Sequence, residues 1–401
     1  MTTALQQIKV VDLSRILAGP WASQMLADLG AEVIKIEKPE VGDDTRHWGP
    51  PYLPSGDHKQ DAAYFHCANR NKKSVAIDIS NEEGQALVKQ LIKDADVLIE
   101  NYKVGGLAKY GLDYKTVKKL NPKLVYCSIT GFGQSGPWAH KAGYDAMIQG
   151  EGGLMSITGE PDGMPMKVGV ALVDVMTGLY SCNAILAALL ARQHTKRGQQ
   201  LDIALLDVQM AALANQGMNY LATGENPQRQ GNGHPNIVPY QTFKTQDGTM
   251  ILAVGNDGQF AKFCQLAERA ELCDDERFGT NAQRVKNRTV LLPIIESIML
   301  TQSCAWWLRE LERIGVPCGA VNTIEQVVEH PQTKHRQMIR QLSTPSGDSV
   351  PTIASPIKMS DTPVQYKNAA PQLGQDTTEI FTDLGYSKSQ IKDLVQGGII
   401  A

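Results

Sequence analysis

The pattern that most constrains the fold is a strand, a helix and a second strand within the first 37 residues. Ile8–Ser14 and Ala31–Glu37 are apolar runs of strand length. Trp21–Leu29 between them is amphipathic and is followed by Gly30, a residue favoured just after a helix. Strand, helix and strand at this spacing form a right-handed βαβ unit with parallel strands. The turn at 14–20 then lies at the carboxyl end of a strand, where open α/β sheets bind ligands.

The alternation of strands and helices continues along the chain. Further strands are expected at Ser74–Ile79, Val97–Glu100, Leu124–Thr130 and Gln200–Leu205. The segment Asn101-Tyr102-Lys103 follows the second of these strands, so it too falls on the ligand-binding edge. The pattern predicts an α/β domain built on a parallel sheet.

The character of the sequence changes after Thr223. Gly224–Pro239 is rich in Gly, Asn and Pro, and Gln241–Val254 alternates around an Asp247-Gly248 hairpin turn. Helical segments follow, which indicates a smaller α+β domain. We therefore predict four parts: the first part of a large domain at 1–200, a linker helix at 201–224, a small domain at 225–330 and a return segment at 331–401.

Composition narrows the class of protein. A net charge of -3 over 401 residues argues against broad binding to nucleic acid or to an anionic membrane. The seven cysteines include no C-x-x-C pair, which speaks against a zinc cage or a disulfide framework and fits a reducing compartment. The most apolar run, Ala184–Ala191, is far shorter than the ~20 residues that span a bilayer, and no secretory signal is evident. These features predict a cytoplasmic protein without a metal site.

Asp174 is the only charged residue between Lys167 and Arg192. A carboxylate taken out of water is unfavourable unless it is paired or hydrogen-bonded. Two interpretations are open and compatible. Asp174 is the N-cap of a helix over about Val175–Arg192, or it is a working nucleophile or base. At a helix N-terminus the carboxylate is expected to stay ionised.

Three other features are ambiguous on local sequence alone. Arg46 lies in a Pro- and Gly-rich stretch at 39–62 that reads as a long loop, and the basic cluster Asn69–Lys73 enters a strand. Arg46 and the basic cluster each either contact a ligand or lie on the solvent-exposed surface without a binding role. Gly131–Gly136 formally matches a dinucleotide-binding fingerprint but does not open an amphipathic helix, so a nicotinamide or flavin site is disfavoured.

Ten motifs follow one another along the chain: Leu17–Pro20, Asp28–Glu37, Gly42–Arg46, Asn69–Ser74, Glu100–Lys103, Gly143–Asp145, Asp174 with Gly178, Pro239-Tyr240, Gly315–Gly319 and Leu373-Gly374. Taken together and in this order, they resemble the class III CoA-transferases, the family of formyl-CoA transferase and carnitine CoA-transferase. The resemblance runs from about Ile8 to Gly398. The resemblance implies a Rossmann-like large domain formed by both chain ends, a small domain, and two ring-shaped subunits interlocked as a homodimer.

Within the family, the sequence is most similar to the succinate–hydroxymethylglutarate (glutarate) CoA-transferases. Phrases that carry this similarity include Trp48–Pro51, Tyr126–Gly131 and Ile237–Lys244. What it implies is exchange of CoA between an acyl-CoA, succinyl-CoA first, and a small dicarboxylic acid. Asp174 would be the nucleophile, passing through a mixed anhydride and an aspartyl-CoA thioester. CoA is then a substrate, and no tightly bound cofactor is expected.

The resemblance also implies binding residues. Lys38, Lys103 and Lys109 would meet the CoA phosphates, Ile77, Ser80 and Asn101 would line the adenine side, and Lys141 and Tyr144 would flank the pantetheine. The far carboxylate of the dicarboxylate would meet Arg46, Arg15 or Arg70, with His234 as a further candidate. Leu17 stands where formyl-CoA transferase has Gln, so oxalate and formyl-CoA are disfavoured as substrates.

Two rival functions are retained. A 2-methylacyl-CoA racemase of the same superfamily pairs its Asp with a His in a Gly-His-Asp motif, because moving an α-proton needs two acid/base groups. This chain has Tyr144 at that position of the motif. A non-catalytic CoA-binding protein is the other alternative.

Overall fold

The computed structural model describes residues 2–56 and 59–401. The chain divides into two compact units. Unit 1 consists of residues 1–152, 168–212 and 331–401, and unit 2 of residues 153–167 and 213–330. Unit 1 therefore takes up both ends of the chain, as the return segment predicted at 331–401 requires.

Unit 1 is built on a six-stranded sheet whose strands pair in parallel. The strands are, in spatial order, β5 (Lys73–Ala76), β2 (Glu32–Glu37), β1 (Lys9–Asp12), β6 (Val97–Glu100), β7 (Val125–Thr130) and β8 (Gln200–Ala204). Counted along the chain within this sheet, the order is 3-2-1-4-5-6, which is the Rossmann arrangement. The order reverses between β1 and β6, so their carboxyl ends flank the position where such sheets bind ligands.

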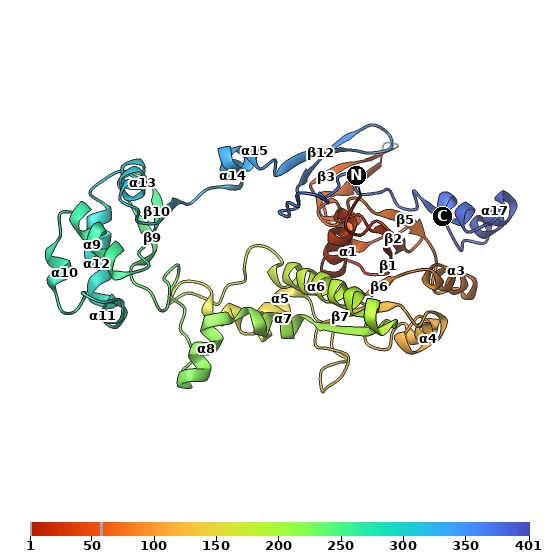
Figure 1. Ribbon diagram of the computed structural model, residues 1–401, viewed down its shortest axis with the longest axis horizontal. Helices are drawn as coiled ribbons and strands as arrows, with labels where there is room; N and C mark the ends of the chain where they lie inside the picture. Colours follow the sequence, from red (N-terminus) through yellow and green to blue (C-terminus); the bar gives the residue numbers. More distant parts are fainter. Residues whose placement is uncertain (1, 57–58) are drawn as a thin grey trace. The chain divides into compact units, whose positions relative to one another are not determined.

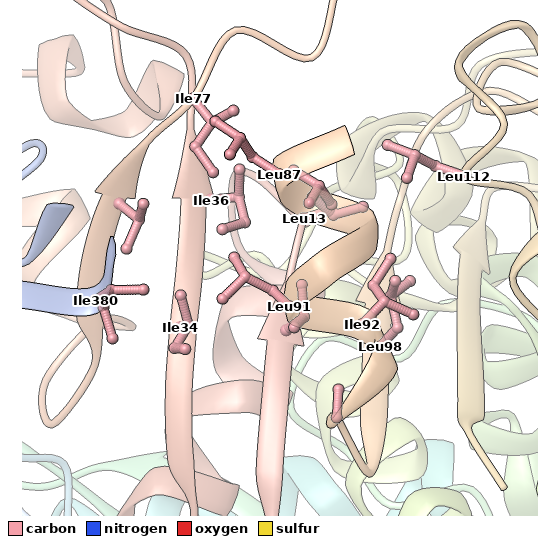
Figure 2. Close-up of a cluster of buried hydrophobic side chains, with 14 of the residues drawn as sticks. Leu13, Ile34, Ile36, Ile77, Leu87, Leu91, Ile92, Leu98, Leu112 and Ile380 are labelled. Atoms are coloured by element: carbon pink, nitrogen blue, oxygen red, sulfur yellow. The ribbon is translucent and has the colours of Figure 1, made fainter. Parts of the chain in front are cut away.

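Helices supply an apolar core on each face of this sheet. On one side lie α3 (Glu82–Lys93), α4 (Tyr114–Leu120), α16 (Thr377–Asp383) and α17 (Lys388–Gln396). Figure 2 shows Leu87, Leu91 and Ile92 of α3 next to apolar side chains of the strands. Because α16 and α17 share this core with α3, the last part of the chain completes the domain that the first part begins.

The other face is covered by α1 (Ala18–Asp28), α6 (Leu172–Thr195) and α7 (Leu205–Ala212). Helices α1 and α6 lie alongside one another (Figure 1). By length and composition α6 could cross a bilayer. A core helix meets the same criterion, and α6 buries Cys182, Ile185 and Ala188 in the core.

The remaining elements of unit 1 are short. They are two antiparallel pairs, β3 (Tyr52–Gly56) with β4 (Lys59–Ala62) and β12 (Ile339–Ser343) with β13 (Ser349–Ile353), and the helices α2 (Ala63–His66), α5 (Asp145–Glu151) and α15 (Pro331–His335). Two 3-10 turns, η1 (Asp44–His47) and η2 (Ala108–Tyr110), complete it.

Unit 2 has a core of its own around a three-stranded antiparallel sheet. The strands β11 (Cys318–Ala320), β10 (Thr249–Ala253) and β9 (Tyr240–Lys244) pair in that order, and the turn at Asp247-Gly248 joins the last two, as predicted. Its helices are α8 (Ala214–Thr223), α9 (Asp257–Leu266), α10 (Glu271–Asp274), α11 (Asn281–Lys286), α12 (Arg288–Met299), α13 (Cys304–Arg313) and α14 (Ile324–Glu329), and η3 (Leu154–Ile157) is a 3-10 turn.

Two expectations about the connections are wrong. The stretch 39–62 is not one irregular loop, because it contains η1 and the β3–β4 pair. Pro54 and Gly56 lie inside that pair and hide its strand pattern. Residues 201–224 are not a linker helix either. They contain most of β8, then α7 of unit 1 and α8 of unit 2, so the chain passes from one unit to the other within them.

Candidate active site

A cavity of about 470 Å³ lies at the carboxyl edge of the parallel sheet, beside the switch point between β1 and β6. Its walls come from the loop after β1 (Arg15–Ala18), the loop after β6 (Asn101–Val104), the end of β7 with the following segment, and Asp174 of α6. The cavity joins segments more than 150 residues apart in the sequence because parallel strands bring their carboxyl ends to one edge.

Asp174 is in the first turn of α6 but does not cap it. The N-cap residue is Ala171, whose side chain cannot accept a hydrogen bond from the helix. The cap is supplied by Asp145 of α5, whose Oδ1 accepts the N–H of Val173 at 2.8 Å and that of Asp174 at 3.3 Å. The other oxygen of Asp145 accepts from Gln149 Nε2 at 2.7 Å. The N-cap interpretation of Asp174 is therefore wrong, because a distant carboxylate already occupies that position.

This arrangement sets the ionisation of Asp174. Burial, and to a smaller extent the negative charge of Asp145, raises the pKa of Asp174 from its usual 3.8 to about 7. The expectation that a carboxylate at the helix N-terminus stays fully ionised is therefore wrong here. A carboxylate with a raised pKa is a stronger base and a better nucleophile once ionised. A smaller fraction of Asp174 is therefore ionised at neutral pH, but that fraction is more reactive.

Two residues at the N-terminus of α1, Leu17 and Ala18, line the same cavity. The first N–H groups of a helix have no acceptor within it. Among the described residues, the N–H groups of Leu17, Ala18 and Gly19 donate no hydrogen bond, and Leu17 and Ala18 line the cavity. Only glycine fits at position 19, where a Cβ would lie 2.2 Å from Ser14 Oγ.

A glycine in α6 brings Asp174 close to these donors. A Cβ on Gly178, one turn beyond Asp174, would lie 2.8 Å from the carbonyl oxygen of Ala18 and 2.9 Å from Cβ of Trp21. The absence of that Cβ lets α6 pack directly on the first turn of α1. Close packing of α6 on α1 thus holds the Asp174 carboxyl group near the first turn of α1.

A second cavity of about 270 Å³ adjoins the first. Both are lined by Arg15, Tyr102 and Tyr110. Lys38 and the segment Ile77–Ser80 line only the second.

The structure brings all eight predicted CoA-binding residues to these two cavities. Lys38, Ile77 and Ser80 line the smaller one, and Asn101, Lys103, Lys109, Lys141 and Tyr144 line the larger one. The side chain of Asn101 is already hydrogen-bonded within the protein. It accepts the N–H of Arg15 at 2.9 Å and donates to the carbonyl of Arg15 at 2.7 Å. The ammonium groups of Lys109 and Lys141 lie over the rings of Tyr110 and Trp138. Whether these residues hold CoA stays a prediction.

Two of the predicted substrate arginines are structural. Arg46 is buried and donates to Glu37, to Asp61 and to the carbonyl of Pro371. Arg70 is also buried, and donates to Asp28 and to the carbonyl of Ile353. The prediction that either one meets the substrate is therefore wrong, because the donors of each guanidinium are occupied by acceptors within unit 1.

Arg15 and Leu17 remain as substrate candidates in unit 1. Arg15 lines both cavities and forms an exposed ion pair with Asp44 at 2.9 Å. Leu17 is buried and lines the larger cavity. His234 belongs to unit 2, where its ring lies 5.3 Å from that of Tyr240 and its Nδ1 accepts the N–H of Asn236. Its role stays a prediction.

Two residues of the site were not predicted in their present roles. Asp145 was noted only as part of a family motif, and Tyr110, which lines both cavities, was not singled out. Tyr102, which also lines both cavities, lies in the segment predicted at the ligand-binding edge. No local signal marks the role of Asp145, since its partner is 28 residues away in the sequence. Within residues 2–56 and 59–401, no group of three or more His, Cys, Asp or Glu side chains is placed to hold a metal ion.

Comparison with known proteins identifies the family of the whole chain. A family model described as CoA-transferase family III matches residues 5–377. A succinate–glutarate CoA-transferase of Agrobacterium fabrum is 51% identical over 385 residues, which cover 95% of each chain. The human succinyl-CoA:glutarate CoA-transferase is 39% identical over 397 residues, covering 99% of this chain and 90% of its own.

The similarity extends to a solved structure. A CAIB/BAIF family protein from Brucella suis superposes with a TM-score of 0.85 at 51% identity, covering 96% of this chain and all of its own. The fold and the relatives together define an enzyme that transfers CoA. The chain belongs to CoA-transferase family III.

Proposed function

We propose that this enzyme moves CoA between succinyl-CoA and a glutarate-like dicarboxylic acid through Asp174. The relatives named above act on succinate or succinyl-CoA and on glutarate, and they align with nearly the whole chain. The observation that carries the proposal is a single carboxyl group, Asp174, of raised pKa in a cavity shared with free backbone donors and three lysines.

The chemistry follows from these groups. The Asp174 carboxylate attacks the thioester carbonyl of succinyl-CoA, the C–S bond breaks, and a mixed anhydride and CoA thiolate result. The thiolate attacks the aspartyl carbonyl, which forms aspartyl-CoA and releases succinate. The acceptor carboxylate then attacks aspartyl-CoA and releases CoA thiolate. Attack of that thiolate on the acceptor acyl carbonyl of the new anhydride yields the product thioester and the free Asp174 carboxylate.

Backbone N–H groups would stabilise the charge that develops in each attack. Every tetrahedral intermediate carries an oxyanion, and donors aimed at it from a rigid element lower the barrier. The N–H groups of Leu17 and Ala18 suit this role because they have no acceptor in the described part of the protein and because both residues line the same cavity as Asp174.

CoA would extend across both cavities. Its phosphates are expected near Lys38, Lys103 and Lys109, and its adenine near Ile77–Ser80 in the smaller cavity. The thioester end would then reach Asp174 past Lys141 and Tyr144. We propose that Arg15 binds the far carboxylate of the dicarboxylate. Of the three arginines predicted for this role, Arg15 is the one that lines the cavity with an exposed side chain.

We further propose that the enzyme is an interlocked homodimer of a reducing compartment. Apolar side chains exposed on both units support an interface, among them Leu190 of α6 and Leu221 of α8, which are 60% and 74% exposed. All seven cysteines are free, which supports the reducing compartment.

Replacing Asp174 tests the proposal. Asp174→Asn keeps the size of the side chain and removes the nucleophile, so CoA transfer from succinyl-CoA to glutarate should fall by at least ~10⁴-fold while CoA still binds. Asp207→Asn is the matched control, because Asp207 is also an aspartate in the first turn of a helix but is exposed.

Two results would count against the proposal. Transfer by the Asp174→Asn variant at a rate near that of the parent would remove Asp174 as nucleophile. Deuterium incorporated from solvent at the α-carbon of a branched acyl-CoA, without transfer, would point to the racemase alternative.

A further inference from the structure

A buried carboxylate, Asp43, lies beneath the loop that carries the free N–H groups. It forms an ion pair with Lys35 at 2.8 Å, and both side chains are fully excluded from solvent. It also accepts the N–H of Thr45 at 3.0 Å and the Thr45 hydroxyl at 2.8 Å. Although burial acts in the opposite direction, Lys35 and these hydrogen bonds lower the pKa of Asp43 to about 2, so it is an acceptor at every physiological pH.

The Asp43 carboxylate also accepts a hydrogen bond from Ile16, a residue with a strained backbone in the loop after β1. The N–H of Ile16 points at both carboxylate oxygens of Asp43, at 3.2 Å each. Ile16 has a φ of 73°, in the left-handed region that a β-branched residue rarely enters. Such a conformation persists only where the surroundings hold it, and strained residues cluster at functional sites.

Hydrogen bonds from both neighbours of β1 hold the rest of this loop. Lys35 Nζ, the partner of Asp43, also donates to the carbonyl of Ser14 at 2.8 Å. The N–H and the carbonyl of Arg15 are both paired with Asn101. After Ile16 the next two N–H groups, of Leu17 and Ala18, have no such partner among the described residues, and both residues line the cavity. The turn at Ile16 therefore decides the direction in which they point.

We propose that Asp43 is a positioning residue for CoA transfer. Through Lys35 and the N–H of Ile16, it keeps the loop in the strained conformation that aims the Leu17 and Ala18 donors at the reacting carbonyl. This inference rests on the proposed function of those donors. A purely stabilising role is a weak explanation of the ion pair, because a buried salt bridge is often no more stable than an apolar pair of the same size.

The test is the variant Asp43→Asn, measured for kcat, for CoA affinity and for thermal stability. Displaced donors should lower kcat by about 10- to 100-fold, less than the ~100- to 1,000-fold for deleting an oxyanion donor. The dissociation constant of CoA should change less than about twofold, because Asp43 is fully buried behind the smaller cavity and the side chains expected to bind CoA are not replaced. Adding Ile16→Gly should raise kcat above that of Asp43→Asn alone, since glycine adopts positive φ without strain.

Thr45→Val is the matched control. It removes a hydrogen bond to the same buried carboxylate and leaves the contact to Ile16 in place. Thr45→Val should lower the melting temperature but keep kcat within about twofold of the parent. Equal losses of kcat in Asp43→Asn and Thr45→Val at matched folded fraction would show that Asp43 is merely structural. A folded Asp43→Asn protein with parental kcat would also overturn the proposal.

A second variant covers the case in which Asp43→Asn does not fold. Lys35→Met with Asp43→Asn removes both buried charges together, which avoids an unpaired charge. The same loss of kcat with intact CoA binding is expected, and parental kcat would contradict the inference. The parent enzyme is assayed in parallel: absence of transfer by the parent refutes the proposed function, whereas parental transfer by the variants refutes only the role of Asp43.

Discussion

At the scale of single residues, the environment of Asp174 determines when it can react. Asp174 is half-buried, and Asp145 of α5, which caps α6, adds a like charge. Both effects oppose ionisation. The proposed nucleophile is therefore ionised only to the extent that the pH exceeds its raised pKa.

The first prediction concerns the pH dependence of transfer. Because the ionised form attacks and the pKa of Asp174 is about 7, kcat/KM should rise roughly tenfold per pH unit below 7 and level off above about pH 8. Initial rates between pH 5.5 and 9 at low succinyl-CoA would show it. A profile that is flat down to pH 5 would mean that Asp174 is ionised far more readily than its surroundings indicate.

The same group should lower the stability of the fold at high pH. Its pKa is raised on folding, so the folded protein binds the proton more tightly, and the free energy of unfolding falls as the pH rises from about 4 to 7. Asp174→Asn should therefore be more stable than the parent at pH 8, by roughly 1–4 kcal/mol, and equally stable near pH 4. Urea unfolding at both pH values checks this, and an equal difference at both would contradict it.

At the scale of elements, the packing of α6 on α1 fixes the site. Gly178→Ala places a methyl group 2.8 Å from the Ala18 carbonyl oxygen, so the helices must separate. We expect a loss of about 1–3 kcal/mol in stability together with reduced kcat. Gly217→Ala in α8 is the control, because its new Cβ would meet only the Leu213 side chain, at 3.2 Å. Parental kcat in the Gly178→Ala variant would show that the close packing does not position Asp174.

The same scale shows what the sequence could predict. The strands β1, β2, β6 and β7 and the hairpin at Asp247-Gly248 were predicted because their signals are local: apolar runs, periodicity and turn residues. The structural roles of Arg46 and Arg70 were not, because their carboxylate partners Glu37 and Asp28 come from elsewhere in the fold. Paired and free arginines look alike in a sequence.

Asp145 and Asp43 illustrate the same limit within the site. One caps a helix 28 residues later, and the other supports Ile16, 27 residues earlier. No periodic pattern in the sequence signals either contact. By contrast, Asp174 stood out because an isolated charge in an apolar run is conspicuous without any knowledge of the fold.

At the scale of the whole molecule, the proposed homodimer gives a direct prediction. Size-exclusion chromatography with light scattering should report about twice the 43.8 kDa of one chain at micromolar concentration. Leu221→Glu in α8 places a charge at an exposed apolar position that the proposed interface would cover, so it should reduce the dimer fraction. A monomeric parent with full transfer activity would contradict the dimer.

In the proposed mechanism, Asp174 itself carries the acyl group and then CoA. The most direct measurement is peptide mass mapping after the enzyme reacts with succinyl-CoA and is quenched with hydroxylamine, which converts an anhydride or thioester of aspartate to a hydroxamate. We expect a hydroxamate at Asp174 and none in the Asp174→Asn variant. Turnover of succinyl-CoA with an unmodified Asp174, or with the hydroxamate at another residue, would contradict it.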